Sequence, residues 1–231
     1  MEKRFLPLAV FVCSFAMAAP VLAHLPYMAG SNSGITVDEP EISKTYYGWL
    51  QGKPAVYLID SAKQFLLYLN LLSPQVDGSR QDFSAKVYKD GKLLAALNSD
   101  DAVWLVTYEP FANDYYVKGP EYEAPASAGN YRVEVYNSGN SGNYVLAIGR
   151  AENLSLGRFL RTLSVLPAVK QDFFGKPWWE AYNNFVGLAA FFAVVILAAA
   201  IYFTISLINT RRLKVRLDNE YGKHQNNRSA G

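Results

Sequence analysis

Acidic and aromatic side chains are concentrated in one short stretch, EPFANDYYVKGPEYE (109–123). Glu109 and Asp114 are close enough in sequence to form a pair of carboxylates, as glycoside hydrolysis needs. Oxygen ligands of this kind also suit calcium. The same stretch fits a third interpretation, an edge loop whose Pro-Phe and Tyr-Tyr dipeptides fill the core of a β-sandwich, and we favour this one.

A second candidate for chemistry is His24. If a signal peptide is cleaved after Ala23, His24 presents both an α-amino group and an imidazole, which together can chelate copper, zinc or nickel. The chain has two histidines, and the other, His224, follows the predicted membrane span. A two-histidine copper site is therefore excluded, whereas a metal site of His24 with Glu109 or Asp114 stays open.

Tyrosine is the third candidate, as a contact residue. Aromatic residues make up 14% of the chain, and 16 of them are tyrosines. Tyr115, Tyr116 and Tyr122 lie in the acidic and aromatic stretch, where they could contact a carbohydrate or a protein. Tyrosine is also a common strand residue that covers half-exposed sheet surface.

Other chemistries lack their residues. The one cysteine, Cys13, lies in the predicted signal peptide, so thiol catalysis and cysteine-ligated metals are excluded in the mature chain. Hydrolase, metalloprotease and nucleotide-binding motifs do not occur. Residues 24–184 carry 14 basic and 17 acidic side chains, which predicts no binding of nucleic acid. We therefore expect no enzyme and no required cofactor, with copper or calcium as the candidate metals.

Two apolar segments define the location. Residues 1–23 have the basic start, apolar centre and small-x-small end of a signal peptide. Residues 185–208 contain no charge and are long enough to cross a bilayer as a helix. Four basic residues follow within eight positions, so the positive-inside rule places the tail, residues 209–231, in the cytoplasm. The sequence predicts a single-pass type I protein of the plasma membrane, with a tail that we expect to be disordered.

Residues 24–152 have the pattern of an antiparallel β-sandwich of jelly-roll type. Short runs rich in Tyr, Val, Ile and Phe alternate with turns rich in Gly, Pro, Asn and Asp. We expect about eight strands, at 43–50, 55–60, 64–72, 83–88, 92–97, 103–108, 130–136 and 144–149, with a further short strand at 115–118. Residues 24–33 are expected to be a polar lead-in.

Residues 153–184 form a juxtamembrane segment. Leu156, Phe159, Leu160 and Leu163 recur at helical spacing, which predicts an amphipathic helix that ends near Pro167. Residues 169–174 could add another turn, with Phe173 and Phe174 in the membrane interface. The helix could pack on the sandwich or lie on the membrane, and the sequence leaves both open.

Several blocks resemble a family of uncharacterised bacterial secreted or single-pass membrane proteins. The blocks are PEISKTYYGWLQGKP (40–54), YEPFANDYYVKGPEY (108–122), GNYRVEVY (129–136), YVLAIGRAE (144–152) and LPAVKQDFF (166–174), together with Ala23-His24. The last hairpin is also similar to the end of bacterial pre-peptidase C-terminal domains, which are β-sandwich accessories of secreted enzymes. The resemblance implies a sandwich fold and brings no activity.

The leading functional hypothesis is a membrane-anchored extracytoplasmic binding module without catalytic activity. Its expected partners are membrane lipid and another membrane or envelope protein. Two alternatives are a copper-type metal-binding protein using His24, and a carbohydrate-binding domain or hydrolase using Glu109 and Asp114.

Overall fold

In a computed structural model, the described residues are 25–30, 34–110, 112–153 and 155–228. The chain divides into two compact units, residues 1–187 and 188–231, and each is treated separately below. The predicted signal peptide, residues 1–23, and His24 lie outside the described residues.

The first unit is a sandwich of two sheets. Sheet A has the strand order β1 (Leu25–Gly30), β3 (Lys44–Gln51), β11 (Ser141–Ile148), β5 (Phe65–Pro74), β9 (Asp114–Ala126) and β8 (Leu105–Glu109). Sheet B has the order β2 (Ile35–Thr36), β4 (Ala55–Ser61), β10 (Gly129–Tyr136), β6 (Ser84–Lys89) and β7 (Lys92–Leu97). Most neighbouring strands are antiparallel, and β1–β3 and β2–β4 are parallel pairs. The predicted β-sandwich is confirmed.

Alternating side chains build the core between the sheets. In β4 the side chains of Ala55, Tyr57 and Ile59 are buried, whereas Leu58 on the other face is exposed. Tyr57 of sheet B and Tyr144 of sheet A share a hydroxyl hydrogen bond of 2.8 Å in this core. Gly48 makes room for the Tyr144 ring, because a Cβ at position 48 would lie 2.5 Å from that ring.

Two predictions about the strands are wrong. Residues 25–30 form β1 rather than a lead-in, and β9 does not end at Gly119-Pro120 but continues to Ala126. The register between β5 and β9 shifts at this dipeptide, where Pro120 has no N–H for the ladder. At this shift the Asn70 amide donates to the carbonyls of Gly119 and Pro120, each at 3.2 Å.

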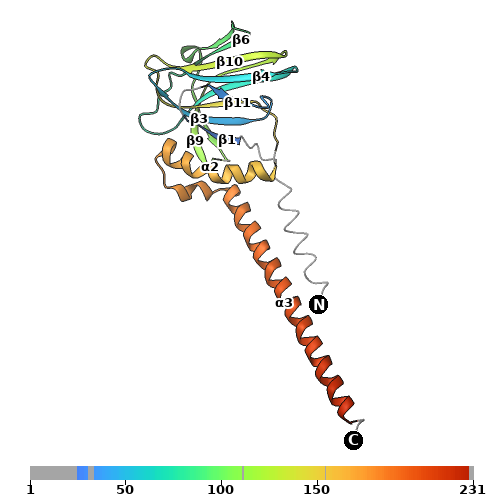
Figure 1. Cartoon of the computed structure of the whole chain (residues 1–231). Coiled ribbons are helices and arrows are strands. Elements are labelled where there is room, and N and C mark those ends of the chain that lie inside the picture. Colours follow the sequence, from blue (N-terminus) through green and yellow to red (C-terminus); the bar gives the residue numbers. More distant parts are fainter. Residues whose placement is uncertain (1–24, 31–33, 111, 154, 229–231) are drawn as a thin grey trace. The chain divides into compact units, whose positions relative to one another are not determined.

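Helix α2 (Leu156–Phe174) covers the outer face of sheet A, so the unit has three layers: sheet B, sheet A and α2 (Figure 1). Ser155 caps its first turn by accepting from the Arg158 N–H at 3.3 Å. Gly175, with φ +60°, ends it in the left-handed conformation. Val169, Phe173 and Phe174 are buried against Tyr47, Tyr116 and Val145 of sheet A, so the expectation that both phenylalanines enter the membrane interface is wrong.

The prediction that this helix ends near Pro167 is wrong. A proline lacks the N–H that would bond to the carbonyl four residues earlier, here Leu163. The Tyr182 hydroxyl donates to that carbonyl at 2.9 Å instead. Tyr182 belongs to η3 (Trp178–Tyr182), which packs on α2 through Ala181 and Leu166. A short η2 (Ser99–Asp101) links β7 to β8.

The second unit consists of most of α3 (Phe185–Arg228). Gly187–Leu217 is long and apolar enough to cross a membrane, and protein buries none of its most apolar window. This candidate span fits a single-pass membrane protein. The tail that we expected to be disordered from residue 209 is helical to Arg228.

Candidate binding groove

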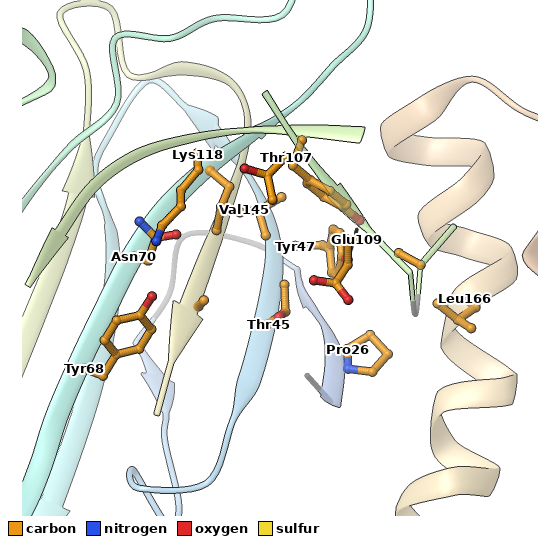
Figure 2. A pocket seen from close by; sticks show the side chains of 14 residues that line it. Pro26, Thr45, Tyr47, Tyr68, Asn70, Thr107, Glu109, Lys118, Val145 and Leu166 are labelled. Carbon is orange, nitrogen blue, oxygen red and sulfur yellow. Dashed lines mark hydrogen bonds between the residues drawn. The ribbon is translucent and has the colours of Figure 1, made fainter. Parts of the chain in front are cut away.

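A groove of about 190 Å³ lies on the outer face of sheet A, beside α2 (Figure 2). Six strands and one helix contribute residues to the groove. The strands do so because neighbouring strands of a sheet bring alternate residues onto one face. The lining residues are Pro26, Thr45, Tyr47, Tyr68, Asn70, Leu72, Thr107, Glu109, Ala112, Tyr116, Lys118, Val145, Ala147 and Leu166. Most of them are distant in sequence, so topology rather than a motif builds this site.

Two buried tyrosines form part of its wall. The hydroxyls of Tyr47 and Tyr116 share a hydrogen bond of 2.7 Å. Burial raises the pKa of both phenols well above the ordinary value of about 10, so both are neutral at physiological pH. The nearby Glu109 carboxylate raises the pKa of both phenols further. The pair is therefore a neutral, rigid element of the groove.

Another part of the wall carries polar groups. Lys118 forms an ion pair of 2.7 Å with Glu121, and the Tyr68 hydroxyl donates to the same carboxylate at 3.3 Å. These two bonds hold the pKa of Glu121 below its ordinary value, with the Lys118 bond as the largest cause. Figure 2 shows Lys118, Asn70 and Tyr68 together, and Glu109 nearer to Pro26 and Leu166. The groove thus has an ion-paired lysine and an asparagine in one part and the Glu109 carboxylate in another.

The predicted carboxylate pair is brought together in β8 and β9. Glu109 and Asp114 are the last paired residues of this ladder, opposite each other across the turn. Glu109 lines the groove. Asp114 does not, because its carboxylate is buried against α2 and bonded to two lysines.

Asp114 is the centre of a buried ion cluster. One oxygen accepts from Lys170 and the other from Lys176, the latter at 2.5 Å. The Lys170 ammonium also donates to the Asn113 carbonyl at 3.1 Å. The exposed fractions are 1% for the Lys170 side chain and 3% for Asp114. This arrangement attaches α2 to the β8–β9 turn and leaves neither Asp114 oxygen without a lysine partner.

The metal prediction stays a prediction. His24 is outside the described residues, but Pro26, two positions later in β1, lines the groove together with Glu109. Within residues 25–30, 34–110, 112–153 and 155–228, no group of three or more His, Cys, Asp or Glu side chains could hold a metal ion.

The three predicted contact tyrosines do not share one face. Tyr116 is buried under α2, and Tyr115, its neighbour in the strand, is exposed on the opposite face. Tyr122 follows the β9 bulge and packs against the core between the sheets. Of the three, Tyr116 alone lines the groove.

Sequence reasoning missed Thr45, Tyr68 and Asn70, which line the groove from β3 and β5. A signal was present in the segment FLLYLNLL (65–72), where Tyr68 and Asn70 interrupt an apolar run two positions apart. That spacing places both on the same face of a strand.

Neither a protein-family model nor a curated protein matches the chain. Solved structures with a similar fold include the pre-peptidase C-terminal domain of a collagenase from Bacillus anthracis, at 13% identity and a TM-score of 0.31. That match covers 51% of this chain and 93% of the other. This match to a pre-peptidase domain is weak, and the wider family resemblance stays a prediction.

Two further similar structures belong to proteins of different kinds. One is a β-glucosidase from Paenibacillus barengoltzii, at 14% identity and a TM-score of 0.25, with 61% of this chain and 15% of the other covered. The other is CorA, a surface-associated copper-binding protein of Methylomicrobium album BG8, at 11% identity and a TM-score of 0.26. The match covers 100% of the CorA chain and 55% of this chain. At such TM-scores neither match bears on the ligand of this chain.

Proposed function

We propose that the protein is an extracytoplasmic binding module without catalytic activity, anchored in the plasma membrane by one span, and that the groove on sheet A recognises its partner. The carrying observation is the lining of the groove, in which Glu109, Lys118 and Asn70 accompany the neutral tyrosine pair. A few directed polar groups among apolar walls are typical of recognition sites.

The dimensions of the groove limit what enters it. A volume of about 190 Å³ lies below the ~300–1,000 Å³ of drug-sized pockets. One sugar ring or one polar side chain of an envelope protein fits this volume. Such a group could bond to Glu109 through hydroxyl or amino donors and to Lys118 through an acceptor.

The orientation is supported by the sequence. A cleavable signal peptide at residues 1–23 would carry the sandwich across the membrane, and Arg211, Arg212, Lys214 and Arg216 would keep the other end inside.

Hydrolysis has less support than binding. A glycosidase needs two carboxyl groups that face the scissile bond. Glu109 faces the groove, but both Asp114 oxygens bond to lysines and Asp114 is not part of the lining.

Photochemical capture tests the proposal. A photoreactive residue replaces Thr45, which lines the groove, in the full chain in its own membrane. The matched control places it at Leu58, which is exposed on the outer face of sheet B. We expect a discrete adduct from position 45, weakened in the same chain by Glu109→Gln, and no such adduct from position 58. Equal, unselective labelling at both positions would reject the groove as a recognition site.

Copper binding is the second candidate, because Pro26 and Glu109 line the same groove and His24 precedes Pro26 by two residues. The α-amino group and imidazole of a mature N-terminal His24 would then bind copper with the Glu109 carboxylate. Intact mass determines the N-terminus, and calorimetric titration with Cu(II) tests the site. A chain that begins at His24 should bind one copper tightly, and an added residue before His24 should abolish this. Glu109→Gln should weaken binding, with Glu123→Gln as a control.

A further inference from the structure

The α2–η3 pair carries apolar side chains that the described part of the chain leaves at least half exposed. Leu166 and Ala181 are buried between α2 and η3, with Phe159, Leu163 and Tyr182 packed around them. On the same two elements, Leu156 is 75% and Leu160 is 55% exposed on α2, and Trp178 is 50% and Trp179 is 55% exposed on η3. We call Leu156, Leu160, Trp178 and Trp179 the α2–η3 apolar surface.

Packing fixes the tryptophans of this surface. The Trp178 ring makes edge-to-face contacts with Trp179 at 5.9 Å and with Tyr182 at 6.5 Å between ring centroids. Tyr182 is itself held by its bond to the Leu163 carbonyl. The Asn113 amide donates to the Asn183 carbonyl at 3.2 Å, which fastens the end of η3 to the β8–β9 turn. The exposed rings therefore belong to a rigid part of the first unit.

Chain length keeps this surface close to the membrane. Trp179 precedes Gly187, the first residue of the candidate span, by eight residues. Eight residues reach at most ~29 Å when fully extended. Both tryptophans therefore stay within about 32 Å of the first residue of the candidate span.

The chemistry of the surface selects lipid as its occupant. Tryptophan favours the boundary between lipid and water, where its ring is apolar and its N–H remains hydrated. Exposed leucines on a neighbouring helix add apolar area, as in helices that lie in the membrane interface. Leaving this apolar surface in water rather than in lipid would cost about 25 cal/mol of free energy per Å².

We propose that the α2–η3 apolar surface docks on the lipid–water interface of the bilayer that α3 crosses. The first unit then has a second attachment to the membrane besides the span. One face of α2 packs on sheet A beside the groove, and the other side of the helix contacts lipid. This inference is independent of what the groove binds.

Tryptophan quenching in vesicles tests the docking. The chain has four tryptophans. The Trp49→Phe/Trp104→Phe variant of the full chain keeps those of the surface, whereas Trp178→Phe/Trp179→Phe keeps the other two as the matched control. Both are reconstituted in vesicles of phosphatidylcholine and phosphatidylglycerol. Bromine is placed on the acyl chain either near the headgroup or near the methyl end.

We expect brominated lipid to quench the first variant several-fold more than the control, most strongly with bromine near the headgroup. Aqueous iodide should quench it weakly. Adding Leu156→Gln and Leu160→Gln should reduce quenching by lipid and increase quenching by iodide.

Three results would overturn the proposal. Quenching by iodide without quenching by lipid would show that the surface faces water. Rings that neither quencher reaches would be covered by protein, such as a second copy of the chain. Lipid quenching that is unchanged by the two leucine substitutions would remove α2 from the docked surface.

Discussion

Asp114 joins helix α2 to the β8–β9 turn, because its carboxylate accepts from both Lys170 and Lys176. In the sequence, Asp114 is a candidate acid, calcium ligand or copper ligand. In the structure, it neutralises Lys170, a lysine that is 56 residues away and almost completely buried. No local pattern predicts this pairing, because it depends on where α2 crosses sheet A.

We predict that Asp114→Asn lowers the free energy of unfolding by about 3–5 kcal/mol, because it leaves the Lys170 ammonium buried without its anion. Chemical denaturation of the full chain in detergent micelles measures the change. Glu123→Gln is the matched control, since it removes an ion pair with Arg150 that is largely exposed, and it should cost less than about 1 kcal/mol. Equal losses in the two variants would argue against a structural role for the cluster.

Helices and strands also depend on distant contacts for their length, as Pro167 and Tyr182 show for α2. Period-two alternation predicted the main strands of the sandwich, because each buries one face. The alternation did not predict that β9 continues through Gly119-Pro120. Helical spacing likewise did not predict that α2 continues through Pro167. In both cases a distant side chain bonds to the backbone at the irregularity: Asn70 donates to the Gly119 and Pro120 carbonyls of β9, and Tyr182 donates to the Leu163 carbonyl of α2.

We predict that Tyr182→Phe destabilises the protein by about 1–2 kcal/mol, since the Leu163 carbonyl then loses its donor. Pro167→Ala restores the backbone N–H, so in that background Tyr182→Phe should cost clearly less. The double-mutant cycle is measured by thermal and chemical unfolding. Identical costs in both backgrounds would mean that the tyrosine does not replace the missing proline donor.

The groove belongs to the scale of the whole molecule, because seven elements meet there. Its candidate residues could be predicted only in part: Glu109 and Tyr116 came from one conspicuous stretch, whereas Thr45, Tyr68 and Asn70 come from two other strands. Strand order makes them neighbours, and local sequence patterns do not predict that order.

Buried tyrosines make the whole fold sensitive to alkaline pH. Burial raises the pKa of Tyr144 to about 12 and that of Tyr57 well above the ordinary value of about 10. Above pH ~10 the unfolded chain loses phenolic protons that the native chain keeps, so these groups stabilise the native state below that pH. Above pH ~10 their contribution to the free energy of unfolding falls by up to about 1.4 kcal/mol per pH unit for each phenol.

The unfolding temperature should therefore fall steeply above pH ~10, and less steeply in a Tyr57→Phe/Tyr144→Phe variant. Circular dichroism and phenolate absorbance, followed together, measure this. Unfolding curves with the same alkaline slope in both proteins would contradict the assignment.

The most direct test of the binding function is to fill the groove. Ala147 lines it from β11 and is almost fully buried, so Ala147→Phe places a ring in the space that a ligand would occupy. The readout is the yield of the photochemical adduct from position 45, compared with the unblocked chain in the same membrane. We predict that the adduct disappears while the thermal unfolding of the variant remains cooperative. An undiminished adduct in a folded variant would contradict the groove as the recognition site.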